Sequence, residues 1–131
     1  TLHTNDAPST LTRLNHMGIA GFNLASSVIL ICAQRLVRRL CPACKQPLPQ
    51  GTGYRAVGCA ACIDGYKGRV AIHQVMPVTP GLQKLILEQA SAQALAAQAA
   101  NDGVRTLRQA GMDKVSAGET TVQEVLAATH G

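Results

Sequence analysis

The chain has 131 residues, enough for one modest domain, and 47% of them are hydrophobic while only 2% are aromatic. Its core must therefore be aliphatic, and the dominance of Ala, Leu and Val favours helices. The formal net charge of +5 is weak evidence for a polyanionic partner. The sequence contains no signal peptide and no apolar stretch long enough to span a bilayer, which predicts a soluble protein in a reducing, cytoplasmic setting.

Two helices are predicted first along the chain. Asp6 is a suitable N-cap for a helix that runs through Met17. A longer helix is predicted from Gly21 to Leu40, because apolar residues recur there at helical spacing. Cys32 lies in this apolar run and is predicted to be buried as a small hydrophobic residue. Pro42 then ends the helix.

The second half of the chain is predicted to hold a short β element and several more helices. Gly65 to Gly68 is typical of a turn, and the residues from Arg69 to Met76 predict a strand. Helices are then predicted around residues 82–86, from 91 to 103, from 105 to 115 and from 121 onward. A capping box formed by Thr121 and Glu124 opens the last of them. The fold class that follows is α+β and mainly helical.

Four cysteines in two pairs of identical spacing are the most informative feature of the sequence. Cys41 and Cys44 form one CxxC pair, Cys59 and Cys62 form the other, and fourteen residues separate the pairs. Two such turns complete a tetrahedral thiolate set that suits a structural zinc ion. The residues between the pairs are rich in Pro and Gly and cannot form a core, so residues 41–62 are predicted to be a zinc-binding module. Two disulfides, a redox CxxC and buried free thiols are the alternatives.

Several short motifs also occur in a distinctive order: Thr1-Leu2-His3-Thr4-Asn5-Asp6-Ala7-Pro8, Gln34-Arg35-Leu36, Arg39-Leu40-Cys41-Pro42, Gly65-Tyr66-Lys67-Gly68-Arg69, Val75-Met76-Pro77, the stretch from Gly103 to Gly111, and Gly118-Glu119-Thr120-Thr121. With the tetracysteine between them, they resemble the family of hexameric secretion ATPases that drive type II secretion and type IV pilus assembly. The resemblance covers essentially the whole chain, although the segment between the cysteine pairs is short for the family.

The resemblance implies that residues 1–131 are the carboxyl-terminal part of a RecA-like P-loop ATPase domain, with the zinc module as a small insert. The stretch from Thr1 to Thr4 is similar to the family's histidine box, so His3 is expected to face the nucleotide γ-phosphate. The P-loop, the acidic box and the Walker B residue lie upstream in the family, and the opening without Met fits a piece of a longer protein. The chain alone is therefore expected not to hydrolyse ATP, and ATP with Mg²⁺ belongs to the full-length parent.

The same resemblance implies partners, and it implies whether the motor extends or retracts a pilus. The partners are the other subunits of a homohexamer and an inner-membrane platform protein, with the parent in the cytoplasm at the bacterial inner membrane. Retraction motors of the family lack the tetracysteine and carry two arginines where this chain has Gln83 and Leu87. Extension or secretion is therefore expected, without a choice between pilus assembly and type II secretion.

Some alternatives stay open at this point. A basic chain with two CxxC pairs is compatible with a zinc-ribbon nucleic-acid-binding module, but the scarce aromatic residues and scattered cations argue against nucleic acid as a partner. A free-standing zinc-stabilised adaptor is another alternative. Arg35, Arg38 and Arg39 are expected either to complement the end of the predicted helix or to contact a nucleotide or a neighbouring subunit. Arg69 is expected to be a solvated charge at a strand edge.

Overall fold

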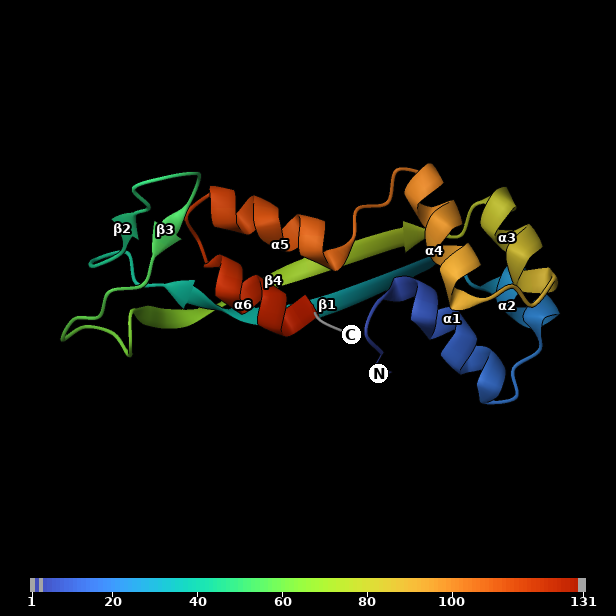
Figure 1. Ribbon diagram of the computed structural model, residues 1–131. Helices are drawn as coiled ribbons and strands as arrows, with labels where there is room; N and C mark the ends of the chain where they lie inside the picture. The colour runs from blue at the N-terminus through green and yellow to red at the C-terminus, as the bar shows by residue number, and fades with distance from the viewer. Residues whose placement is uncertain (1, 3, 130–131) are drawn as a thin grey trace. The chain divides into compact units, whose positions relative to one another are not determined.

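The computed structural model of the chain describes Leu2 and residues 4–129. The chain separates into two compact units, one of Thr1–Ala33 with His73–Thr106 and one of Gln34–Ile72 with Leu107–Gly131. Strands β1 (Leu30–Leu40) and β4 (Tyr66–Pro77) each run through a unit boundary, and they pair as a two-stranded sheet (Figure 1). No helix among the described residues combines the length and the apolar composition needed to cross a membrane.

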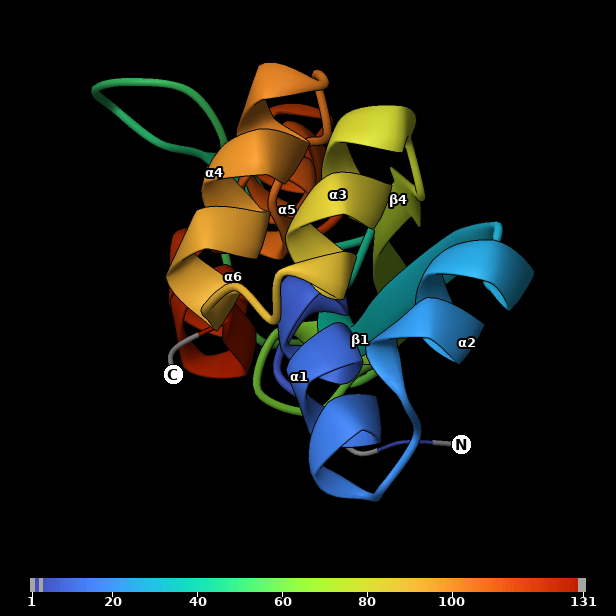
Figure 2. The ribbon, with the colours of Figure 1, turned by 90° about the vertical axis from the view of Figure 1, so that its right-hand side faces the viewer.

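The first unit contains four helices in its described part: α1 (Ala7–His16), α2 (Gly21–Ser27), α3 (Pro80–Leu87) and α4 (Ala92–Asn101). Figure 2 looks onto these helices, of which α3 packs against both α2 and α4, and α4 also packs against α1. Their interior is aliphatic, with Leu11, Leu24 and Leu82 almost fully buried. Gly21 permits close packing of α2 on α3, because a Cβ there would lie 2.9 Å from the Ile86 carbonyl oxygen.

Side-chain caps begin three of these helices. Asp6 Oδ1 accepts a hydrogen bond from the Ser9 amide at 2.9 Å, and Thr79 and Ser91 cap α3 and α4 in the same way. Each cap satisfies one of the backbone N–H groups that have no partner within the helix. The predicted starts at Asp6 and Ser91 are therefore confirmed.

The described part of the second unit contains the cysteine module and two helices. Strand β2 (Gln46–Pro47) pairs antiparallel with β3 (Tyr54–Arg55), and α5 (Leu107–Ser116) packs on α6 (Val122–Thr129). Val125 of α6 is fully buried against Gly111, where a Cβ would lie 2.5 Å from Val125 Cγ1. Thr121 caps α6 by accepting a hydrogen bond from the Glu124 amide at 3.3 Å, which is one half of the predicted capping box.

The predicted helix from Gly21 to Leu40 is wrong beyond Ser27, where α2 ends and β1 follows. Burial at the start of β1 alternates, with Ile31 and Ala33 buried and the residues beside them exposed, which is the two-residue period of a strand. The β-branched residues around Ile31 favour this extended backbone. Cys32 points to the other face of the strand and is exposed, so the prediction of a buried Cys32 is also wrong.

The strand predicted before the third helix is confirmed and is longer than expected. Because β4 begins at Tyr66, the turn predicted at Gly65–Gly68 is shorter than the sequence indicated. Backbone hydrogen bonds join the residues just outside the two strands at both ends of the pair. Between these hydrogen bonds, β1 has 11 residues and β4 has 12. The extra residue in β4 implies a bulge, and Gly68 with a φ of 76° has a suitable conformation for it. The chain mixes helices and strands, as the coarse α+β prediction stated.

Candidate metal centre

The four cysteines of the two CxxC pairs come together at the end of β1. Their sulfur atoms all lie within 4.8 Å of one another. The Sγ–Sγ distance is 3.6 Å for Cys59 and Cys62, 3.7 Å for Cys44 and Cys62, and 3.8 Å for Cys41 and Cys59. Four sulfurs about 2.3 Å from a central zinc ion form a tetrahedron with edges of about 3.8 Å. The four cysteines are therefore positioned to hold one metal ion, and the identity of that ion as zinc stays a prediction.

Short turns place these sulfur atoms. Cys41 is buried directly after β1, and its amide donates a hydrogen bond to the carbonyl of the residue before β4 at 2.9 Å. In the second pair, the Cys62 amide donates to the Cys59 carbonyl at 3.3 Å and closes the turn. Gly58 N lies 3.4 Å from Cys44 Sγ, and Cys59 N lies 3.3 Å from Cys62 Sγ. Backbone N–H groups that donate to sulfur in this way stabilise thiolates.

The neighbouring thiols also influence the protonation of Cys41 and Cys44. Burial raises the pKa of Cys41, but hydrogen bonds from the backbone and from neighbouring thiols outweigh burial and lower the pKa to about 7. The hydrogen bond from Gly58 N lowers the pKa of Cys44, yet burial and the other three thiols raise it to about 11. The Cys41 thiolate therefore forms readily near neutral pH, whereas the Cys44 thiolate forms there only when a cation compensates its charge. Metal binding is expected to release protons and to weaken as the pH falls.

The chemistry of this donor set favours a structural role. Four thiolates around one ion leave no open coordination position for a substrate or water, and Zn²⁺ matches sulfur ligands in a tetrahedral arrangement. Bound zinc would supply a cross-link between the two CxxC turns. All five cysteines are free in the structure, and the shortest separation of 3.6 Å exceeds the S–S bond of about 2.05 Å.

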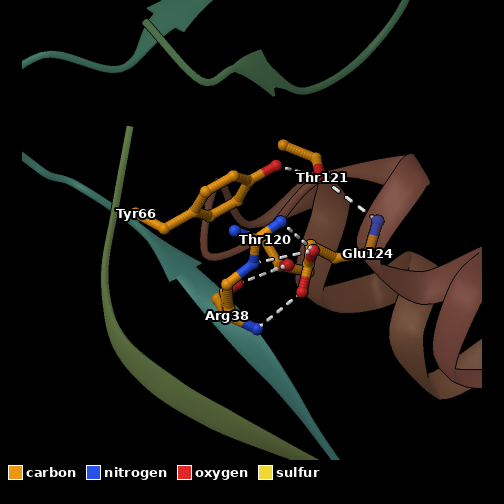
Figure 3. A network of polar contacts seen from close by, with 5 residues as sticks. All are labelled: Arg38, Tyr66, Thr120, Thr121 and Glu124. Atoms are coloured by element: carbon orange, nitrogen blue, oxygen red, sulfur yellow. Dashed lines mark hydrogen bonds and ion pairs between the residues drawn. The ribbon is translucent and has the colours of Figure 1, made fainter. Parts of the chain in front are cut away.

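A network of polar side chains joins β1 to α6 just before the first cysteine (Figure 3). The Arg38 guanidinium donates to the Glu124 carboxylate at 2.7 and 3.0 Å, and the Arg38 amide donates to the same carboxylate at 2.9 Å. The fully buried Thr120 hydroxyl donates to the Arg38 carbonyl oxygen at 2.8 Å. The hydroxyls of Tyr66 and Thr121 lie 2.9 Å apart. Residues far apart in the sequence therefore connect the end of β1, where the cysteine module begins, to α6.

The charged pair in this network keeps both partners ionised at neutral pH. Burial raises the pKa of Glu124, but hydrogen bonds from Arg38 and its positive charge outweigh burial and hold the pKa below its ordinary value. The hydrogen bond to Glu124 raises the pKa of Arg38 in turn. The Arg38 side chain is 53% exposed, so solvent screens the pair and limits its contribution to stability. Its clearest effect is to position β1 against α6.

The connection between α5 and α6 holds the residues on both sides of the first cysteine pair. The Leu40 amide donates to the Glu119 carbonyl at 2.9 Å, directly before Cys41. The Lys45 ammonium donates to the Gly118 carbonyl at 2.9 Å and lies 4.5 Å from the centroid of the Tyr54 ring. Glycine suits this position, because the φ of Gly118 is 78° and a Cβ would lie 2.9 Å from the same ring.

The other residues singled out in the sequence lie apart from the cysteine cluster or outside the described residues. His3, which is expected at the nucleotide γ-phosphate, belongs to the part of the chain that the structure does not describe. The basic residues predicted at a helix end are on β1 instead, so the prediction that they complement a helix dipole is wrong: Arg35, Arg38 and Arg39. Arg69 is exposed on β4.

Sequence reasoning missed the side chains that hold the module in place. Glu124 carries one local signal, the capping box, in which its carboxylate would return to the Thr121 amide. The carboxylate instead accepts hydrogen bonds from Arg38, which is 86 positions away in the sequence. No local pattern identifies such a partner, and the same holds for Tyr66 and Lys45.

Comparisons with known proteins show which family the chain resembles over almost its whole length. The chain matches the model of a family described as Type II/IV secretion system protein over residues 1–127. It is 44% identical to the type IV pilus assembly ATPase PilB of Acinetobacter baylyi, covering 95% of this chain and 25% of that protein. It is 43% identical to the type II secretion system protein HxcR of Pseudomonas aeruginosa, covering 99% of this chain and 28% of that protein. It is 39% identical to the type II secretion system ATPase E of Vibrio cholerae, covering 98% of this chain and 29% of that protein.

The chain spans about a quarter of the length of these curated relatives, 25% to 29%. The alignment with HxcR extends over 131 residues, whereas the alignment with PilB extends over 144, so PilB has additional residues within the matched region. The family match covers almost the whole chain, and the identities are well above those of a distant relationship. The chain therefore belongs to the type II/IV secretion system protein family.

Proposed function

We propose that the chain is the carboxyl-terminal region of a hexameric ATPase that powers type IV pilus assembly or type II secretion. The observation that carries the proposal is the family match over residues 1–127, with relatives named as pilus assembly and type II secretion ATPases. The clustered cysteines support it, because the resemblance places a tetracysteine zinc module in the assembly motors. The parent would contain a RecA-like nucleotide-binding domain, of which these residues form the carboxyl-terminal part.

In this proposal the chain supplies structure and one residue that faces the nucleotide. Phosphoryl transfer needs a phosphate cradle and a magnesium ligand, and the 131 residues contain no P-loop. His3 would sense the γ-phosphate in the parent. The module of residues 41–62 would give each subunit a rigid contact surface, through which subunit movements reach an inner-membrane platform protein. The parent would work in the cytoplasm against the inner membrane.

The residues at the two positions where a retraction motor has arginines support extension or secretion. The Gln83 side chain donates to the Ala25 carbonyl at 3.1 Å and so joins α3 to α2. Leu87 is 54% exposed at the end of α3. Neither side chain supplies the positive charge of a retraction motor, and the relatives above carry the names of assembly and secretion proteins.

Kinetics of the full-length parent test the ATPase assignment. The parent should hydrolyse ATP, and the 131-residue chain should not. His3→Ala should lower the turnover number of the parent about 10²-fold with little change in nucleotide affinity, because a γ-phosphate sensor acts where charge develops in the transition state. His16→Ala, at an exposed position of α1, is the control and should leave turnover unchanged. Equal loss of ADP and ATP affinity with an unchanged turnover number would contradict this role of His3.

A deletion strain tests whether the parent drives assembly or secretion, or instead drives retraction. It should lack surface pili or fail to export the secreted substrate, whereas a strain that keeps pili and cannot withdraw them would show a retraction motor. Salt-dependent binding of DNA or RNA by the purified chain would instead favour the nucleic-acid-binding alternative.

A further inference from the structure

A cavity of about 250 Å³ lies in the second unit, between the β2–β3 ladder and the start of α6. We call it the Tyr–Arg pocket, and its lining includes Leu48, Tyr54, Arg55, Tyr66, Val122 and Gln123. The chain has two tyrosines, and both line this cavity. Both are partly exposed, so packing of a buried core does not explain why they meet here.

The volume of the pocket indicates the size of its ligand. Sites for cofactors and drug-sized molecules enclose about 300–1,000 Å³, so this pocket is small for a whole cofactor and suits an amino-acid side chain. Tyr and Arg are the residue types that dominate binding energy where one protein inserts a side chain into another. The pocket therefore has the size and the composition of a docking site for a protein partner.

Charge indicates which side chain fits. Residues 34–72 contain seven Lys and Arg and a single acidic residue, Asp64. Arg38 is paired with Glu124, but the Arg55 guanidinium that lines the pocket donates to the neutral side-chain amide of Gln46. Among the contacts of the described residues, no acid compensates the Arg55 charge. A guanidinium in this situation can bind a carboxylate through two parallel hydrogen bonds.

We propose that the Tyr–Arg pocket binds a carboxylate-bearing side chain, Glu or Asp, on an exposed segment of a protein partner. Arg55 would bind the carboxylate, and the apolar stem of the inserted side chain would lie against Tyr54 and Tyr66. The first turn of α6 lines the same pocket, and the positive end of its dipole adds to the attraction for a negative group. The inference rests on the second unit and does not depend on ATP hydrolysis by the parent.

Selection of peptides tests the proposal. The purified 131-residue chain is used to select from a library of random heptapeptides, and the selected peptides are synthesised for titration. We expect them to be enriched in Asp and Glu, and to bind at least about tenfold more weakly to Arg55→Gln, since a hydrogen bond to a charged group is lost. Arg69→Gln is the matched control, because it removes the same charge from an exposed position on β4 that does not line the pocket.

Amide shifts in NMR spectra locate the bound peptide. Arg55 is exposed, so the Arg55→Gln chain should keep the spectrum of the folded protein away from the pocket. On addition of peptide to the unmodified chain, the largest shifts should occur at Tyr54, Arg55, Val122 and Gln123. Peptides without acidic enrichment, a selection that yields no peptide, or equal weakening by both arginine variants would overturn the proposal. If the chain bound vesicles of anionic lipid in preference to the peptides, and this binding depended on Arg55, the proposal that the partner is a protein would be wrong.

Discussion

The two units of the chain differ in charge and in the contacts that hold them together. The first unit contains three basic and three acidic residues, and the second contains nine basic and four acidic residues. Helices α1 to α4 of the first unit each bury at least two side chains. In the second unit, no residue from 42 to 64 is buried.

This difference indicates two ways of stabilising a segment of chain. Burial of aliphatic side chains stabilises a helix by about 25 cal/mol for each Å² of apolar surface removed from water. The module of residues 41–62 has almost no such surface to bury, so we expect metal binding, with a few hydrogen bonds, to offset the entropy of ordering it. We therefore expect the two units to respond differently to loss of metal and to core substitutions.

Removal of the metal should have the largest effect, and the effect should be confined to the second unit. Zinc binding to small structural sites contributes about 10–16 kcal/mol in peptides, far more than any single side chain here. Chelation, or Cys59→Ser, should abolish hydrogen-exchange protection in residues 41–65 while the amides of α1 to α4 stay protected. Elemental analysis of the unmodified chain should give about one zinc per monomer.

Cys32→Ser is the control for this experiment. Cys32 is exposed on β1 and lies outside the cysteine cluster, so the zinc content and the exchange pattern should not change. A chain that stays protected in the module without any metal, or that forms two disulfides there, would show that the four sulfurs serve another purpose.

A core substitution should have the next largest effect, and this effect should begin in the first unit. Leu82 in α3 is fully buried, so Leu82→Ala should lower the free energy of unfolding by about 2–5 kcal/mol. Leu87→Ala in the same helix is the matched control, because Leu87 is 54% exposed and the change should be within about 0.5 kcal/mol. Zinc content should be the same in both variants. A loss of zinc on Leu82→Ala at a temperature where the protein is folded would show that the units depend on each other.

Features that depend on residues close together in the chain could be predicted from the sequence, whereas features that depend on distant residues could not. The helix starts at Asp6 and Ser91 and the cysteine cluster follow from residues that lie close together in the chain, and these features were predictable. Strand β1 was not, because its apolar residues fit a helical spacing as well as a strand, and only pairing with β4 decides between them. The ion pair of Arg38 with Glu124 also forms across a long separation, and no local pattern reports it.

Loss of the ion pair should have a small effect that depends on pH, because solvent screens the pair. Because the pKa of folded Glu124 is held below its ordinary value of 4.5, the pair stabilises the fold above about pH 4.5, and this contribution is lost as the pH falls through the lower folded pKa. Glu124→Gln should therefore be less stable than the unmodified chain at pH 7, and the difference should shrink below pH 4.5. Urea unfolding of both proteins at each pH measures this difference. A difference for Glu124→Gln that stays constant with pH would show that packing, not charge, is responsible.

A comparably small effect should come from the cap of α1 in the first unit. Asp6 Oδ1 accepts a hydrogen bond from the Ser9 amide at 2.9 Å, so Asp6→Ala leaves an N–H group at the start of the helix without its partner. We expect a loss of about 1 kcal/mol in the free energy of unfolding, with faster hydrogen exchange in the first turn of α1. Asp6→Asn keeps an oxygen in the same place and should retain most of the stability, which separates the cap from the charge of the carboxylate. If Asp6→Ala instead loosened the cysteine module as much as the first turn of α1, the stabilities of the two units would be coupled, and the contrast between a capped helical unit and a metal-held unit would fail.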